Sequence, residues 1–242
     1  DLVSHGYIVF SADHTYGAAL TVFPDGTVAL NRPDALPKNV SDDVYDQAAR
    51  ILGQTWVGDI RFVMDQAEKI NRGEIDSPLK GRLDLTRSGV FGHSTGGGAT
   101  VETCFIDPRC KAGLTMDAWL IPYDRQIPQQ GLSQPFLYMQ SELWVARRNP
   151  SLVAALYDHS QGPAYRITID GTNHYDFSDL PGLTPLAPWI GLKGPIPAGR
   201  DMAIINAFSV AFFDQTLKGI PSPILQGASA QYPEVQFDAI KP

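Results

Sequence analysis

A glycine-flanked serine carries the clearest chemical signal in the sequence. The motif Gly92-His93-Ser94-Thr95-Gly96 follows the apolar pair Val90-Phe91 and precedes a further glycine-rich run. This context is typical of a strand, a sharp turn and a helix, in which a serine hydroxyl is exposed above a sheet. The flanking glycines are expected because a side chain at either position would collide with the strand or the helix. We therefore interpret Ser94 as the nucleophile of a serine hydrolase, rather than as part of an ordinary glycine-rich turn, and the Thr95 amide as one oxyanion donor.

Two segments further along the chain could supply the acid and the base that such a serine needs. A neutral imidazole must take the hydroxyl proton, and a carboxylate must orient the imidazole. Residues 112–116 have the composition of a strand and end at Asp117, and residues 165–169 alternate as a strand before a glycine turn delivers His174. The order serine, acid, histidine is that of α/β-hydrolases, and the carboxyl ends of parallel strands meet at one edge of a sheet. We predict that the three side chains meet there.

Other residues compete for the roles of acid and base. The alternative acids are Asp170 and Asp179, and the alternative bases are His14 and His159. Asp170 lies too near His174 in sequence to reach back easily to its Nδ1. His159 falls at the polar end of a helix, where we expect it to be solvated, whereas we expect His14 to line the substrate site. Trp119, two residues after the proposed acid, is either a core residue or a wall of the substrate pocket, and we expect His93 to pack under the turn.

Several separated segments together carry a family resemblance. They are the opening stretch 1–9, residues 93–101, Asp117-Ala118-Trp119, and Gly171-Thr172-Asn173-His174 with Phe177 and Asp179 after it. In this order they resemble the platelet-activating-factor acetylhydrolase family of α/β-hydrolases, and the resemblance runs from the first residue to about Lys218. It implies a triad of Ser94, Asp117 and His174 that hydrolyses short-acyl carboxylic esters, with a role in lipid degradation and with no metal or other cofactor. Dienelactone-hydrolase and polyester-hydrolase relatives share this layout.

The sequence departs from the resembled family at its beginning. In that family a His-Gly-rich loop, which gives the second oxyanion donor, precedes the segment that matches Asp1 to Val9, and this sequence begins without that loop and without methionine. We therefore expect the first strands of the domain, and the second donor, to belong to a missing N-terminal segment of the same domain.

Composition limits the class of protein and its partners. The chain has 242 residues, 43% of them hydrophobic, which suits one α/β-hydrolase domain over residues 1–242. Its 19 basic and 26 acidic residues give a net charge of −7, which disfavours nucleic acid and anionic membranes as partners. No run approaches the roughly 18 apolar residues of a membrane span, so no integral membrane association is expected. The expected partners are small-molecule, lipid or polyester esters, and a secreted location is favoured over a cytoplasmic one.

Alternating strand and helix patterns indicate a doubly wound, mostly parallel sheet flanked by helices. In the first half of the chain we expect a buried strand over Tyr7–Ala12, a loop or small lid over about 17–40, and a helix over 41–71 that is interrupted near Gly53 and Gly58. In the second half we expect a strand over 134–140, a helix that begins after Glu142 and runs through Leu152 to Tyr157, a substrate-facing cap over 180–199, and a final helix capped by Asp201 that ends at Lys218.

Two short motifs and the overall function leave alternatives open. Cys104 and Cys110 form either a local disulfide or two separate buried thiols, and Asn39-Val40-Ser41 is either a glycosylation sequon or, as we favour, a helix cap at Ser41. Besides ester hydrolysis, the same triad could perform acyl transfer or amide cleavage. The fold could also serve as a ligand-binding module without chemistry.

Overall fold

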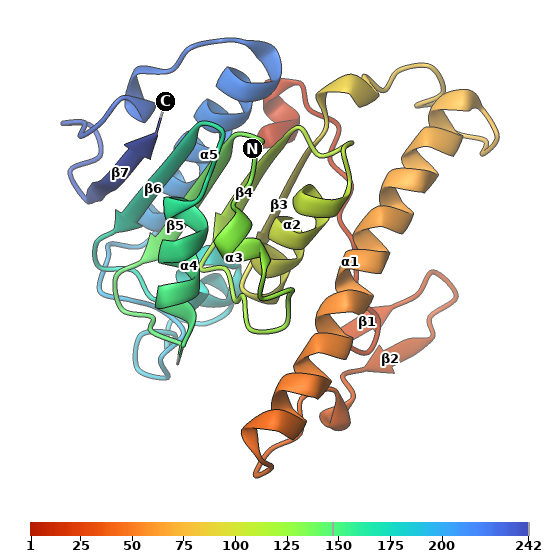
Figure 1. Cartoon of the computed structure of the whole chain (residues 1–242), viewed down its shortest axis with the longest axis horizontal. Coiled ribbons are helices and arrows are strands. Elements are labelled where there is room, and N and C mark those ends of the chain that lie inside the picture. Colours follow the sequence, from red (N-terminus) through yellow and green to blue (C-terminus); the bar gives the residue numbers. More distant parts are fainter. Residues whose placement is uncertain (147, 242) are drawn as a thin grey trace.

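A five-stranded, mostly parallel sheet forms the centre of the structure (Figure 1). The structure is a computed structural model that describes residues 1–146 and 148–241. The strands lie in the order β3 (Gly89–His93), β4 (Ala112–Met116), β5 (Phe136–Ser141), β6 (Ala164–Ile169) and β7 (Val235–Lys241). Neighbouring strands from β3 to β6 are parallel, and β7 is antiparallel to β6. The α/β class with a mostly parallel, helix-flanked sheet is therefore confirmed.

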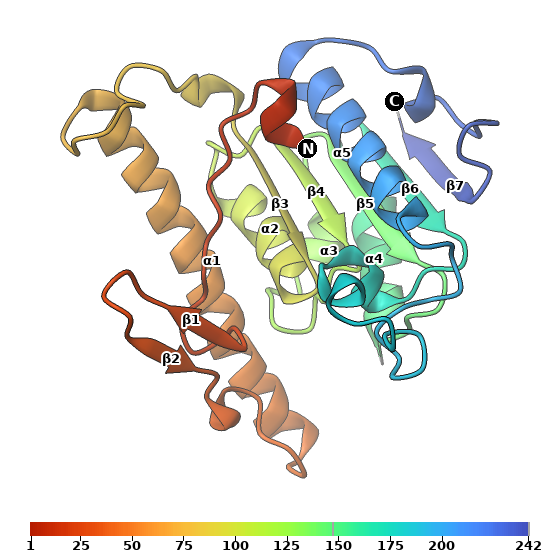
Figure 2. The ribbon, with the colours of Figure 1, turned by 180° about the vertical axis from the view of Figure 1, so that it is seen from behind.

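Helices cover both faces of this sheet. One face carries α2 (Thr95–Ile106), α3 (Ile127–Gln130) and α4 (Asn149–Asp158), and the other carries α5 (Arg200–Lys218) (Figures 1 and 2). Phe208 and Phe212 of α5 pack on one side with residues of β4 to β6, while Val101 of α2 packs on the other side with Phe136 and Tyr138. Because both faces are covered, the central strands are almost continuously apolar, as parallel strands usually are.

The long helix α1 (Asp42–Arg72) lies beside α2 at the edge of the molecule (Figure 1). It begins where the Ser41 side chain accepts a hydrogen bond from the Val44 amide, which confirms the cap interpretation, and it ends at Gly73 in the left-handed conformation. The expected interruptions near Gly53 and Gly58 were wrong, because α1 is continuous through both residues. A side chain at Gly53 would press on Pro122, so this glycine permits close packing within a continuous helix.

The segment Tyr7–Ala12 is not the buried strand that its sequence predicts. Within the described chain these residues pair with no strand, and Ile8, Val9 and Phe10 are 45%, 38% and 41% exposed. The segment runs between α1 and the sheet edge at β3 (Figure 2). It follows a short 3-10 helix, η1 (Leu2–His5). An apolar run becomes a strand only where a neighbouring strand forms backbone hydrogen bonds with it. The edge strand β3 does not pair with Tyr7–Ala12.

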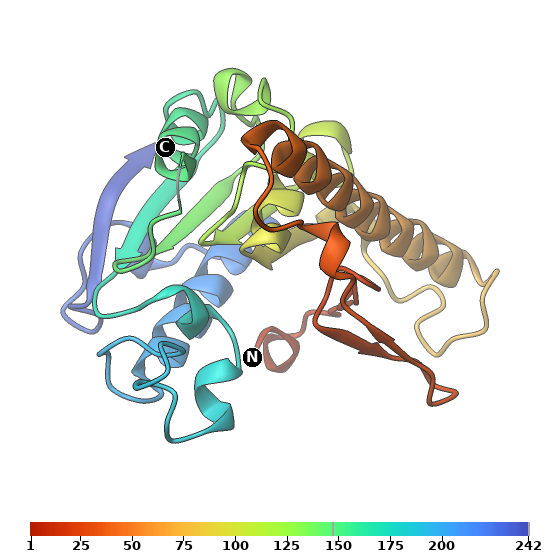
Figure 3. The same cartoon turned by 90° about the horizontal axis from the view of Figure 1, so that it is seen from below.

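The expected lid over about 17–40 contains a small hairpin. Its strands are β1 (Leu20–Val22) and β2 (Val28–Leu30), and the 3-10 helix η2 (Pro33–Ala35) follows them. Figure 3 shows this hairpin projecting on the side of the sheet that carries α5, across from the segment that follows His174, whereas the start of α1 lies on the opposite side. In Figure 1 the hairpin lies toward the same end of the molecule as the tips of β4 and β5.

The C-terminal half differs from expectation in three places. Helix α4 begins only at Asn149, so the residues directly after Glu142 form a loop. Asp201 lies in the first turn of α5, after Gly199, and is not its cap. Strand β7 was not predicted, although Val235 to Ala239 alternate between apolar and polar residues as a strand does. The remaining short helices are η3 (Leu85–Arg87), η4 (His174–Phe177), η5 (Leu180–Leu183) and η6 (Pro223–Leu225).

A disulfide joins Cys104, near the end of α2, to Cys110, just before β4. Both residues are fully buried, so the structure supports the first of the two alternatives for this pair. Among the residues that the structure describes, no helix has the length and apolar character that crossing a membrane requires.

Candidate active site

Ser94 stands on a strained turn between β3 and α2. Its φ of 56° and ψ of −117° lie in a region that side chains other than glycine rarely adopt. The turn is fixed from both sides, because the Ser94 amide donates to Met116 O at 2.9 Å and the Ser94 carbonyl accepts from the Trp119 amide at 2.9 Å. Strain of this kind persists where the surroundings hold it, and it is concentrated at functional sites.

The two glycines around Ser94 differ in what they allow. A Cβ on Gly92 would stand 2.5 Å from the backbone carbonyl carbon of Gly96, so the incoming strand tolerates no side chain there, as predicted. A Cβ on Gly96 would only touch the Trp56 ring at 3.7 Å, an ordinary contact. The prediction that a side chain at either position would collide was therefore wrong for Gly96.

Asp117 follows β4 directly, and its side chain is only 2% exposed. Its φ of 44° places a second non-glycine residue in the left-handed region, next to the serine turn. The carboxylate accepts hydrogen bonds from the Ser141 amide at 2.8 Å and from the Ser141 hydroxyl at 2.6 Å. Its Oδ2 also lies 3.1 Å from His174 Nδ1. The structure therefore brings Asp117 and His174 together, and it orients the carboxylate from the end of β5.

His174 opens the short helix η4, which the neighbouring loop holds in place. Glu142, just after β5, accepts a hydrogen bond from the Gly171 amide at 2.7 Å, and the Leu143 amide donates to Thr172 O at 3.1 Å. At the start of η4, Asp176 accepts from the Asn173 amide at 2.8 Å. The loop after β5 thus fixes the turn that carries the imidazole.

A buried ion cluster lies behind this turn, formed by Asp176, Lys193 and Asp201. The Lys193 ammonium lies 3.2 Å from Asp176 and 3.0 Å from Asp201, and Asp176 is fully buried. Burial works against the charged ammonium, but the hydrogen bonds with Asp201 and Asp176 outweigh it and raise the pKa of Lys193. Asp176 also accepts from the Gly194 amide at 2.7 Å. The ion cluster therefore ties η4 to the segment 180–199 and to α5.

Two aromatic rings enclose the His174 imidazole. Trp144 stacks on it with ring centroids 4.2 Å apart and an interplanar angle of 16°, and the His93 ring lies 4.3 Å away. Burial, together with the neighbouring His174, lowers the pKa of His93 to about 4. His93 therefore packs against the base as a neutral ring near pH 7. Trp144 was not singled out from the sequence, because nothing in its local pattern places that loop over a residue 30 positions later.

A pocket of about 460 Å³ opens at Ser94. Its lining combines aromatic and aliphatic side chains with a few charged ones at the rim. The lining residues are Leu36, Asp42, Tyr45, Ser94, Thr95, Trp119, Ile121, Trp144, Ala146 and Arg148. Trp119 was open between a core position and a pocket wall, and it lines the pocket while remaining half-buried. Thr95 is the first residue of α2, where a backbone amide has no acceptor within the helix.

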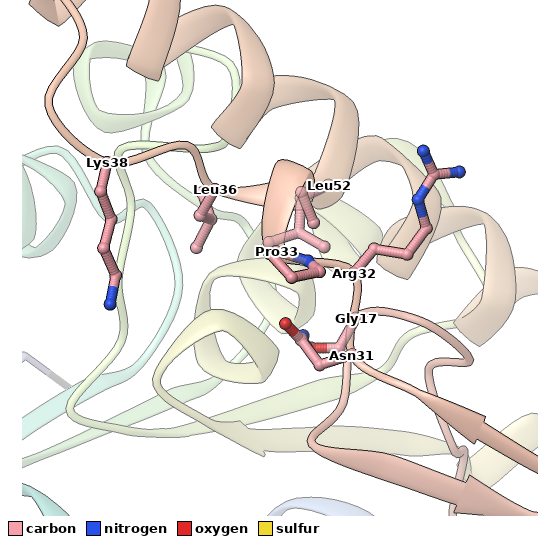
Figure 4. Close-up of a pocket in the computed structure, with 8 residues that line it drawn as sticks. Gly17, Asn31, Arg32, Pro33, Leu36, Lys38 and Leu52 are labelled. Atoms are coloured by element: carbon pink, nitrogen blue, oxygen red, sulfur yellow. The ribbon is translucent and has the colours of Figure 1, made fainter.

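A second pocket, of about 550 Å³, lies under the hairpin (Figure 4). Gly17, Asn31, Arg32, Pro33 and Lys38 line it together with Ala35, Leu36 and Leu52. Leu36 lines both pockets, so the two pockets are neighbours. Arg32 already pairs with Asp34 at the surface.

The competing candidates lie elsewhere. His14 contacts Asp59 at 2.9 Å and stacks on Trp56, and it is not among the residues that line the pocket at Ser94. The Asp170 carboxylate accepts from Gln236 on β7 at 2.8 Å. Asp179 and His159 are both exposed, at the starts or ends of other helices. None of these four has a hydrogen bond to His174 within residues 1–146 and 148–241.

The arrangement has the parts of a nucleophilic site. An imidazole is oriented by a buried carboxylate, a serine stands on a tight turn in the adjoining pocket, and the N-terminus of α2, which favours negative charge, begins at Thr95. In the described part of the chain the Ser94 hydroxyl has no hydrogen bond to His174, a bond that often tightens only when substrate is present. The same residues contain no cluster of three or more side chains that could hold a metal ion.

Comparison with known proteins places the chain in a known family. The family described as "Platelet-activating factor acetylhydrolase, isoform II" matches residues 47–228, which confirms the resemblance seen in the sequence. A platelet-activating factor acetylhydrolase of Cavia porcellus is 26% identical over 232 residues, which cover 90% of this chain and 52% of that protein. A protein of Arthroderma benhamiae named "Probable 1-alkyl-2-acetylglycerophosphocholine esterase" is 28% identical over 258 residues, covering 97% and 59%.

A solved structure agrees with this grouping. The ferulic acid esterase from Streptomyces cinnamoneus superposes with a TM-score of 0.74 and 26% sequence identity, over 94% of this chain and 64% of that chain. The likeness supports an α/β-hydrolase fold. The chain spans little more than half the length of the curated relatives.

Proposed function

Because the chain belongs to the platelet-activating factor acetylhydrolase, isoform II family, we propose that it is a serine carboxylic-ester hydrolase that acts through an acyl-enzyme on short-acyl esters. The observation that supports this most directly is the hydrogen bond of 3.1 Å between His174 and the buried Asp117, beside the pocket that holds Ser94. The names of the two curated relatives refer to acetyl esters, and they favour a small acyl group.

In the proposed mechanism each residue has one task. The Ser94 hydroxyl attacks the ester carbonyl while His174 Nε2 takes its proton, and Asp117 holds the imidazole tautomer and stabilises the imidazolium. The Thr95 amide donates to the oxyanion at the N-terminus of α2. His174 then gives the proton to the leaving alcohol, and water, activated in the same way, hydrolyses the acyl-Ser94 ester. A second oxyanion donor from a further segment remains a prediction.

Replacement of the nucleophile tests the proposal. We expect wild-type protein to release p-nitrophenol from p-nitrophenyl acetate with a burst, and Ser94→Ala to lower turnover by about 10⁴-fold or more while the melting temperature stays nearly unchanged. The matched control is Ser133→Ala, a serine that is exposed and outside the pocket. Full turnover by Ser94→Ala would overturn the assignment.

Chemical labelling separates hydrolysis from the other functions this fold could have. An active-site phosphonate should label Ser94, and product analysis with added alcohols or amines should show acid as the main product. Failure of labelling in a protein that still binds the ester would instead support a binding module, and dominant transfer to the added nucleophile would support an acyltransferase.

The disulfide supports a secreted location as part of the proposal. Disulfides persist mainly in oxidising compartments, and the described chain has no free cysteine. We expect the bond to form fully when the protein is exported and only partly when it is retained in a reducing cytosol, which thiol titration under denaturing conditions measures. An unpaired thiol in the exported protein would contradict this.

A further inference from the structure

Three aromatic side chains surround the pocket at Ser94, and we refer to them as the aromatic wall. Tyr45 comes from α1, Trp119 from the loop after β4, and Trp144 from the loop after β5. All three are half-buried, so each ring presents part of its surface to the pocket. Elements far apart in the sequence thus converge on one space with rings, and the proposed chemistry of a short-acyl ester does not by itself require them.

The rings are arranged to receive a further ring. Tyr45 and Trp119 lie 6.3 Å apart with planes tilted by 53°, so the two rings are not stacked on each other, and both line the pocket. Aromatic pairs prefer edge-to-face and offset arrangements with centroids 4.5–7 Å apart. Leu36 and Ile121 complete the apolar lining. A planar aromatic group therefore finds partners here that a saturated group of the same size does not.

The charges at the rim do not call for an ionic substrate group. Arg148 is held by Asp46, with its guanidinium nitrogens 3.1 and 2.8 Å from the two carboxylate oxygens. Asp46 is also bound by Arg125. An anionic group entering the pocket would have to compete with this carboxylate for Arg148, so the pocket disfavours a ring that carries negative charge.

The position of Trp144 indicates which half of the ester carries the ring. Trp144 stacks directly on His174, and His174 is the group that protonates the departing alcohol oxygen in the proposed mechanism. The alcohol half of the ester must therefore lie next to His174 and next to the Trp144 ring that covers it. The acyl half lies on the other side of the scissile bond.

On the premise of the proposed function, we propose that the preferred substrates are esters of a small acyl group with an alcohol that carries an uncharged aromatic ring next to the scissile bond. The aromatic wall selects the ring. Ser94, His174 and Asp117 perform the same hydrolysis on any ester that reaches them. The preference is a property of the alcohol side.

Matched substrate pairs test this directly. Benzyl acetate and cyclohexylmethyl acetate differ only in the aromaticity of the ring on the alcohol side, and methyl phenylacetate and methyl cyclohexylacetate differ in the same way on the acyl side. We expect kcat/KM to favour benzyl acetate over cyclohexylmethyl acetate by about threefold to tenfold, and the acyl-side pair to differ by less than twofold. A ratio near one for the alcohol-side pair, or a larger ratio for the acyl-side pair, overturns the proposal.

Variants connect the preference to the rings. The ratio for the alcohol-side pair cancels effects that a substitution has on both substrates, so it can be read even where Trp144→Leu slows the chemistry through His174. Tyr45→Leu and Trp144→Leu should each bring the ratio toward one, while Tyr45→Phe should keep it. The matched control is Phe62→Leu, an exposed ring on α1 outside the pocket. Unchanged ratios in both leucine variants would overturn the assignment to the aromatic wall.

Failure of this inference can be told apart from failure of the proposed function. If the proposed function is wrong, none of the four esters is hydrolysed and Ser94→Ala changes nothing. If only the inference is wrong, the two acetates are hydrolysed in a manner that depends on Ser94, and the alcohol-side ratio is near one or is exceeded by the acyl-side ratio.

Discussion

At the residue scale, the carboxylate of Asp117 is held by hydrogen bonds from the residue at the end of β5. Two donors from one residue, the amide and the hydroxyl of Ser141, fix its oxygens at 2.8 and 2.6 Å. A carboxylate fixed in this way keeps the imidazole in one tautomer and one orientation, which is the role an acid has in this kind of site. Ser141 therefore positions the acid without touching substrate.

Removing the Ser141 hydroxyl should weaken catalysis. We expect Ser141→Ala to lower kcat for p-nitrophenyl acetate by about tenfold to a hundredfold, since a hydrogen bond to a charged group contributes about 1.5–3 kcal/mol, with a smaller change in KM. Steady-state kinetics measure both constants. The exposed Ser133→Ala serves as control, and an unchanged kcat in Ser141→Ala would contradict the positioning role.

The neutral imidazole of His93 should make stability depend on pH. The pKa of His93 is lowered to about 4 in the folded protein. Between about pH 6.5 and 4, His93 is therefore protonated in the unfolded chain and neutral in the folded one. The free energy of unfolding should therefore fall as the pH falls through this range, by at most about 3 kcal/mol from this group. No contribution is expected above pH 7.

Denaturant unfolding at several pH values measures this effect. His93→Asn should lose stability at pH 7 through altered packing, yet show a shallower decline toward pH 4 than the wild type. His159→Asn, which changes an exposed histidine, should keep the wild-type slope. Equal slopes in wild type and His93→Asn would show that this imidazole does not cause the decline.

The residues that could be predicted were those with a local signature. Ser94 stands in a glycine-rich motif with a known geometry. Asp117 directly follows an apolar run, and His174 follows an alternating strand and a glycine turn, so their meeting follows from the strand ends of a parallel sheet. Trp144 could not be predicted, because its contact with His174 depends on how the loop after β5 folds over the turn after β6. The expected place of His14 at the substrate site was not found among the pocket residues, since His14 stacks on Trp56.

At the element scale, the ion cluster of Asp176, Lys193 and Asp201 joins three elements behind the base. Its three side chains are at most 10% exposed, so the charges depend on one another. Removing one partner of a buried ion pair costs far more than removing an exposed one, because the remaining charge is left without compensation in a poorly solvated place. The position of η4, and with it His174, therefore depends on a contact that involves the segment 180–199.

Breaking the ion cluster should affect both stability and activity. We expect Lys193→Met to lower the melting temperature by about 10 °C, from a loss of about 3–5 kcal/mol, and to reduce kcat more than it raises KM. The control is Arg87→Met, which breaks the exposed pair with Asp84 and should shift the melting temperature by little. A melting temperature as high as that of Arg87→Met would contradict the account.

The disulfide should stabilise the fold without serving the chemistry. It closes a loop of six positions between Cys104 and Cys110, which contributes about 2 kcal/mol in a chain-entropy estimate. We expect reductant to lower the melting temperature by about 4–8 °C in calorimetry. The activity per folded molecule should not change, because the bond lies near the end of α2 opposite Ser94. A large loss of activity under conditions where the protein stays folded would show a coupling that this arrangement does not provide.

Elements whose start and end are marked by local sequence signals were predicted well. Elements that depend on a partner distant in the sequence were not. Helix α1 has its serine cap, its helical period and its terminal glycine, and β4 to β6 are apolar runs that both faces of a sheet bury. Tyr7–Ala12 has the same composition as such a strand, but it pairs with no strand in the described chain. Strand β7 is the opposite case: it was not predicted from its short alternating pattern, and it pairs with β6 and packs Val235 into the core beside α5.

At the scale of the whole molecule, packing is uneven. The sheet from β4 to β6 is covered on both faces, whereas residues 7–40 lie outside it with many apolar side chains exposed. Regions with few buried contacts open with low free energy, while the core opens only with global unfolding. The two parts should therefore differ in the rate at which their backbone amides exchange with solvent.

Amide hydrogen exchange measures this difference. We expect amides of β4, β5 and β6 to exchange slowest, and those of residues 7–40 to exchange fastest apart from chain ends, with α1 between them. Slow exchange over Tyr7–Ala12, comparable to that of β4, would show that this segment is protected in solution in a way the described contacts do not account for.

One residue of the aromatic wall, Tyr45, stands on a helix that makes no hydrogen bond to the serine turn among the described residues, and this separation bears on how the protein could diversify. Gly92 admits no replacement, because the backbone of the following helix occupies the space. Tyr45, in contrast, lies on the outer helix α1, so a mutational library at this position could redirect selectivity while leaving the reacting groups intact. Proteins that share this fold could therefore change their range of ester substrates by substituting a few side chains, while the catalytic residues stay the same.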